Sequence, residues 1–164
     1  MKKLIVILIV LLAFSCKEKK GYEMRLLFEN NTENNITVKL YPKNEYMHYD
    51  MYRTSDIGGG YNNTEFIIKT NENKIFFTSG NINQKPYDLT SNVFDSIFVI
   101  INTDSSHLIK FSSNIAVGYS ENIFSENSIW DYRVVEEGRE DMGGLHPVES
   151  HQFTFEVLVD KLVK

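Results

Sequence analysis

The sequence has one cysteine, three prolines and one tryptophan among 164 residues, and it is short of basic side chains. A single thiol excludes an internal disulfide framework and a zinc site built from several cysteines. From Gly21 onward the chain carries 12 Lys and Arg against 21 Asp and Glu, a net charge of −9. Because this charge repels phosphate backbones, we expect no nucleic-acid partner.

Catalytic and cofactor motifs are also missing. There is no Gly-x-Ser-x-Gly nucleophile turn, and Gly58-Gly59-Gly60 lacks the strand-to-helix setting of a phosphate-binding loop. The histidines have no zinc-type spacing, although the last two can approach each other across a loop; they are His48, His107, His146 and His151. We therefore expect no catalytic residue, no cofactor and no metal, and we do not expect an enzyme.

Helical periodicity is absent from every segment longer than about ten residues, whereas period-two patterns are frequent. In residues 36–41 the apolar Ile36, Val38 and Leu40 alternate with polar residues, which is typical of a half-buried strand. Residues 25–29 precede this strand across an Asn-rich turn and predict a hairpin with it. Residues 64–69 and 74–78 predict a second hairpin.

The most apolar stretch, residues 93–101, predicts a strand that is either buried on both faces or crosses the centre of the fold. Residues 107–111 are expected to return beside it, and residues 129–135 and 151–159 to form further strands. Trp130 is expected to anchor the core near the end of a strand. Seven to nine short strands predict an all-β antiparallel sandwich, with an immunoglobulin-like topology as one option.

The only cysteine lies where an apolar run turns abruptly charged. Lys2 and Lys3 precede an apolar run from Leu4 to Phe14, which matches a secretory signal and, at about ten residues, is shorter than the roughly 20 that span a bilayer. The segment Leu12-Ala13-Phe14-Ser15-Cys16 resembles the lipobox of bacterial lipoproteins, with Ala where many have Leu. The resemblance implies that the Cys16 thiol is alkylated by diacylglycerol, that the chain is cut before it, and that palmitate-type chains anchor it.

These features divide the chain into a signal peptide (1–15), a lipidated cysteine with a charged tether (16–22) and one β-rich domain (23–164). Together with the strand pattern, they resemble small lipoproteins of the Bacteroidota type. The resemblance implies a bacterial cell envelope location in the outer membrane, held to the membrane through Cys16. Whether the domain faces the periplasm or the outside stays open, as does its oligomeric state.

Two segments are candidates for binding. Residues 41–61 are rich in aromatic groups, and Tyr46, Tyr49 and Tyr52 form a candidate loop for a protein or glycan partner; packing of this loop against the sandwich is the alternative. Residues 131–149 form an acidic loop in this prediction, either a solvated face or a calcium site. The triplet Asp95-Ser96-Ile97 resembles an O-glycosylation motif of Bacteroidota envelope proteins, although Ser96 falls within the most apolar predicted strand.

Three functions remain open. The leading one is a lipid-anchored, non-enzymatic binding or interaction module. The second is an accessory subunit of an outer-membrane assembly. The third is a hydrolase of an envelope polymer, which requires the acidic residues and His146 or His151 to meet at one pocket.

Overall fold

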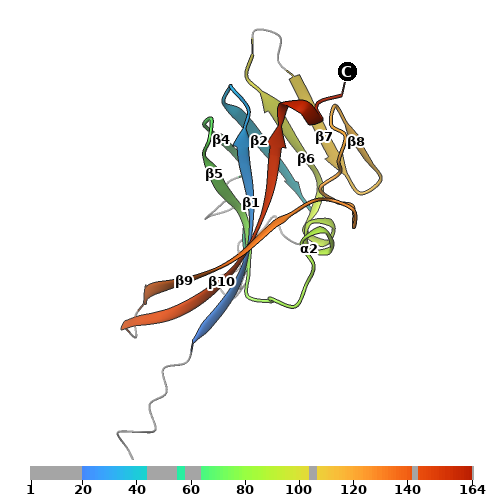
Figure 1. The fold of residues 1–164 in the computed structure, drawn as a ribbon. Helices are drawn as coiled ribbons and strands as arrows, with labels where there is room; N and C mark the ends of the chain where they lie inside the picture. The colour runs from blue at the N-terminus through green and yellow to red at the C-terminus, as the bar shows by residue number, and fades with distance from the viewer. Residues whose placement is uncertain (1–19, 44–54, 58–63, 104–106, 142–143, 164) are drawn as a thin grey trace, which may run out of the picture.

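The computed structural model describes residues 20–43, 55–57, 64–103, 107–141 and 144–163, and their strands form two five-stranded sheets (Figure 1). Sheet I contains, in spatial order, β3 (Ser55–Ile57), β5 (Asn73–Ser79), β1 (Gly21–Asn31), β10 (Gly144–Leu158) and β9 (Asp131–Asp141). Sheet II contains, in the same way, β4 (Glu65–Ile68), β2 (Ile36–Pro42), β6 (Phe94–Ile101), β7 (His107–Ser112) and β8 (Ile115–Val117). One helix, α2 (Pro86–Val93), leads into β6, and a short 3-10 turn, η2 (Val159–Lys161), follows β10.

The core lies between the two sheets and is rich in phenylalanine. Phe28 of β1 and Phe155 of β10 in sheet I are fully buried, and Phe111 of sheet II meets Phe155 edge-on with ring centroids 5.6 Å apart. Trp130, directly before β9, also packs edge-on against Phe155 at 5.6 Å, as predicted. The predicted all-β sandwich is thereby confirmed, with both sheets burying one face against the other.

Strand β6 crosses the middle of sheet II between β2 and β7. Its residues Ile97, Val99 and Ile101 face the core and are buried, whereas Ser96 and Phe98 on the other face are half-buried. Of the two alternatives for this stretch, the central strand is therefore the one found, and burial on both faces is not.

The hairpin predictions had mixed outcomes. β6 and β7 do form an antiparallel hairpin, but β1 and β2 belong to different sheets, and so do β4 and β5. The Asn-rich segment after β1 carries the chain across the core from one sheet to the other. Two half-buried strands of the same pattern can pair in one sheet or face each other in two, so the pattern alone does not separate these cases.

The strand order also differs from the immunoglobulin option. Immunoglobulin constant domains place four strands in one sheet and three in the other, in the order ABED and CFG. Here β1 lies between β5 and β10, and it pairs with β10 in parallel from Gly21 to Asn31. The two ends of the domain are therefore joined in the centre of sheet I, within an otherwise antiparallel fold.

Sheet I extends past the sandwich as a twisted arm of three strands, seen at the lower left of Figure 1. We define the arm as residues 21–23, 135–141 and 144–150, where β1, β9 and β10 continue beyond the last pair between β1 and β5. β1 begins at Gly21, inside the segment predicted as a tether. No helix among the described residues is long and apolar enough to cross a membrane.

Candidate functional site

The residues assigned to sites from the sequence fall outside the described part of the chain. They are the lipid-attachment residue Cys16 and the three loop tyrosines Tyr46, Tyr49 and Tyr52. Both assignments therefore stay predictions. Tyr41, which opens the same aromatic segment, lies on the outer face of sheet II and is 45% exposed. Its ring contacts that of Phe98 in a tilted arrangement, with ring centroids 4.8 Å apart.

The acidic segment 131–149 is not a loop, because almost all of it belongs to the β9–β10 hairpin. Most of its charged residues lie on β9, the edge strand of sheet I, where charges discourage pairing with another chain. Among the described residues, no group of three His, Cys, Asp or Glu side chains is placed to hold a metal ion.

One histidine of the predicted set takes part in a polar chain along the arm. The Tyr132 hydroxyl lies 2.8 Å from Nδ1 of His151, and Nε2 of His151 lies 3.0 Å from Oε1 of Glu149. The other Glu149 oxygen pairs with Nζ of Lys20 at 2.8 Å, and Lys20 also pairs with Glu136. The contact with Lys20, followed by that with His151, holds the pKa of Glu149 below its ordinary value.

These polar contacts attach Lys20, at the start of the domain, to the arm. They include part of what the hydrolase hypothesis requires, because His151 contacts Glu149 of the acidic segment. The side chain of His146 lies outside the described residues.

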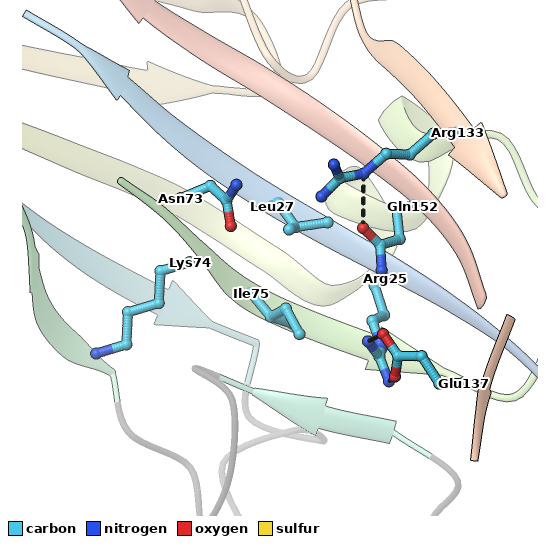
Figure 2. Close-up of a pocket in the computed structure, with 8 residues that line it drawn as sticks. All are labelled: Arg25, Leu27, Asn73, Lys74, Ile75, Arg133, Glu137 and Gln152. Atoms are coloured by element: carbon cyan, nitrogen blue, oxygen red, sulfur yellow. Dashed lines mark hydrogen bonds and ion pairs between the residues drawn. The ribbon is translucent and has the colours of Figure 1, made fainter. Parts of the chain in front are cut away.

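A second arrangement lies on the outer face of sheet I, where an open groove of about 430 Å³ crosses four strands (Figure 2). Leu27 of β1 and Ile75 of β5 are directly paired and form its apolar floor. Asn73, Arg133 and Gln152 line the groove around this floor, and Arg25 and Glu137 close one end.

Arg25 is held by two carboxylates. Its Nη1 and Nη2 donate to the two oxygens of Glu137 at 3.0 and 2.8 Å, and Nη2 also pairs with Glu23 on the same strand. Burial lowers the pKa of the guanidinium, but the hydrogen bonds and charges of the two carboxylates outweigh this effect and raise it. Its charge is thus already balanced within the protein.

Arg133 is held differently. It lies directly opposite Gln152 in the β9–β10 pair, and its Nε donates to Oε1 of this buried glutamine at 2.9 Å. Within the described residues its terminal amino groups have no protein acceptor. The arrangement therefore presents an oriented cation to whatever enters the groove.

A smaller cavity, of about 340 Å³, lies at the other end of the sandwich. Its lining includes Thr32 and Asn34 from the connection after β1, His107 at the start of β7, and the apolar Val159 and Leu162 near the C-terminus. The hydroxyl of Thr32 accepts a hydrogen bond from the Asn34 N–H at 3.3 Å, which fixes the shape of the rim.

The groove was not predicted from the sequence. Arg25 lies at an outward position of β1, and a polar residue at such a position has the same local pattern whether it faces solvent or lines a site. The groove forms only because β10 brings residue 152 beside residue 25, a pairing between opposite ends of the chain. No family model, curated protein or solved structure matches this chain.

Proposed function

We propose that the protein is a lipid-anchored module of a bacterial cell envelope that binds a partner without catalysing a reaction. In this proposal Cys16 carries the lipid and attaches the chain to the outer membrane. The domain then presents its sheet faces and edges to a protein or glycan.

The position of Lys20 supports this proposal. Lys20 is fixed to the arm by Glu136 and Glu149, and β1 begins at the next residue. Four residue spacings separate Cys16 from Lys20, so a fully extended chain spans at most about 14 Å between them. A lipid on Cys16 therefore holds the arm close to the membrane, and the rest of the sandwich projects from it.

The accessory-subunit alternative shares the anchor and differs in having a permanent protein partner. Purification of the full chain in mild detergent distinguishes the two. A permanent partner copurifies with the chain, whereas a binding module is recovered alone. The hydrolase alternative rests on the contacts of His151 with Tyr132 and Glu149. Neither described cavity includes His151 in its lining, so we favour the binding module.

Metabolic labelling tests the anchor directly. Cells that express the full chain are fed a clickable fatty acid, and the wild type is compared with Cys16→Ala. We expect the wild type to carry the label and Cys16→Ala to lose it. A matched control, Lys69→Gln in an exposed turn, should keep the label, since its side chain is 72% exposed and distant in sequence from Cys16. Label absent from the wild type overturns the proposed anchor.

A further inference from the structure

The groove on the outer face of sheet I has the composition of a small-ligand site. Its floor is aliphatic, and its polar groups come from four neighbouring strands. Pockets of a few hundred cubic ångströms with an apolar surface and a few oriented polar groups are typical of small-molecule sites. At about 430 Å³ and open on one side, it has room for one or two sugar-sized units.

The charged side chains that line the groove indicate which kind of ligand it binds. The chain as a whole carries −5, but three of the lining side chains are cationic and only Glu137 is anionic. Arg25 is neutralised by Glu137 and Glu23, and Lys74 leans away over the ring of Phe66 at 5.2 Å. The cation that remains directed into the groove is Arg133, which favours a single carboxylate rather than a polyanion.

The orientation of Arg133 is fixed before a ligand arrives. Gln152, which is only 4% exposed, holds Nε, so the two terminal amino groups point across the groove. Figure 2 shows the guanidinium and the Asn73 amide on opposite sides of Leu27. A planar guanidinium with its terminal donors available binds a carboxylate in two-point fashion.

The remaining lining matches a hydroxylated ring. The amides of Asn73 and Gln152 each carry donors and an acceptor, as sugar hydroxyls require. Leu27 and Ile75 offer an aliphatic surface for the C–H face of a ring. We propose that this groove binds an acidic sugar, a uronate unit of a glycan, with its carboxylate on Arg133 and its ring over Leu27 and Ile75.

This inference rests on the proposed binding function but not on the anchor, so the two can fail separately. It is tested with the full ¹⁵N-labelled chain purified in mild detergent. Digalacturonate and diglucuronate are titrated against their methyl esters, which keep the ring and hydroxyls and remove the charge. Amide signals of Leu27, Ile75 and Gln152 report on the groove.

We expect the uronates to shift these signals and the methyl esters to shift them at least tenfold more weakly. Arg133→Gln should abolish the difference between acid and ester, whereas the matched control Lys69→Gln should retain it. Equal binding of acid and ester, or an unchanged difference in Arg133→Gln, overturns the proposal. The proposal is also overturned if neither uronate shifts these amide signals at concentrations up to about 20 mM. An acetylated dipeptide with a free carboxylate is titrated as well. If it alone shifts the signals, the ligand is a peptide terminus and not an acidic sugar, and the proposal is overturned.

Discussion

Arg25 on β1 and Glu137 on β9 form a two-point ion pair that reaches across the strand between them. The side chain of Arg25 is 13% exposed and that of Glu137 is 39% exposed. The same guanidinium meets Glu23, whose side chain is 5% exposed. Arg25 thus compensates a buried carboxylate and a half-exposed one, and the two carboxylates do not depend on it equally.

We therefore expect two substitutions in this cluster to differ in cost. Arg25→Met removes the cation that both Glu23 and Glu137 contact, and should lower the free energy of unfolding by about 3 kcal/mol. Glu137→Gln keeps an acceptor for Arg25 at a half-exposed position and should cost about 1 kcal/mol. Urea denaturation measures both. Equal losses for the two variants would show that Glu23 does not need Arg25.

Asn30 is expected to be the most sensitive polar residue of the fold. It is fully buried, and its side-chain amide donates to the carbonyl oxygens of Asn34 and Ile68 at 2.9 and 3.1 Å. Its side-chain oxygen accepts from the backbone N–H and the hydroxyl of Thr32. Asn30→Ala leaves several buried partners unsatisfied and should lower the free energy of unfolding by about 3–4 kcal/mol.

The neighbouring Asn31 provides a matched control for this measurement. Its amide makes one long hydrogen bond, 3.4 Å, to Glu156, and the residue is half-buried. Asn31→Ala should therefore cost less than about 1 kcal/mol in the same denaturation experiment. Similar losses at both positions would contradict the role given to Asn30.

Asn30 also shows which part of the fold could not be predicted from the sequence. The alternation in residues 36–40 and the apolar run from Val93 predicted strands in these two segments. This was possible because the pattern of apolar and polar side chains that marks a strand is set by residues close together in the chain. The Asn-rich segment predicted a hairpin turn, since asparagine tolerates turn conformations. In the structure Asn30 instead bonds to Ile68, 38 positions away, and anchors a crossing between sheets. Such a contact leaves no local pattern.

The groove was hidden for a related reason. Arg25 and Glu137 are 112 positions apart, and Arg133 and Gln152 meet only once β9 and β10 have paired. A charged residue at an outward strand position has the same local pattern whether it faces solvent or a partner. The site therefore depends on register, which a single sequence does not display.

Acidification should weaken the attachment of Lys20 to the arm. The pKa of Glu149 is held below its ordinary value of 4.5, chiefly by Lys20. The unfolded chain therefore takes up a proton at Glu149 at a higher pH than the folded chain does. The stability that this contact contributes is present above about pH 4.5 and is lost as the pH falls through the folded pKa.

We expect the urea midpoint of the wild type to fall more steeply below that pH than the midpoint of Glu149→Gln. Glu72→Gln, in an exposed turn where the glutamate side chain is 54% exposed, serves as the control and should follow the wild type. Identical pH slopes for the wild type and Glu149→Gln would mean that Lys20 is not held by this carboxylate in solution.

Alkaline pH should expose the role of Tyr119, which joins the end of sheet I to the segment after β8. Its hydroxyl donates to the Glu156 carbonyl oxygen at 2.9 Å and accepts from the Leu158 N–H at 3.0 Å. Burial raises the pKa of this phenol to about 12. Above pH 10, the ordinary pKa of tyrosine, the folded chain keeps a proton on Tyr119 that the unfolded chain loses. The stability that the protonated phenol contributes is therefore complete below pH 10 and is lost as the pH rises through about 12.

Tyr119→Phe should cost about 1–2 kcal/mol at neutral pH, because the partly buried Leu158 N–H loses its acceptor. The difference from the wild type should then shrink above about pH 10, since only the wild type has the phenol to lose. Denaturant midpoints at several alkaline pH values measure this, with ultraviolet absorbance following tyrosinate formation. Tyr22→Phe, at a position 50% exposed, is the control and should parallel the wild type. A constant gap between Tyr119→Phe and the wild type across this range would show that the phenol titrates alike in both states, and that burial at this position does not protect its proton.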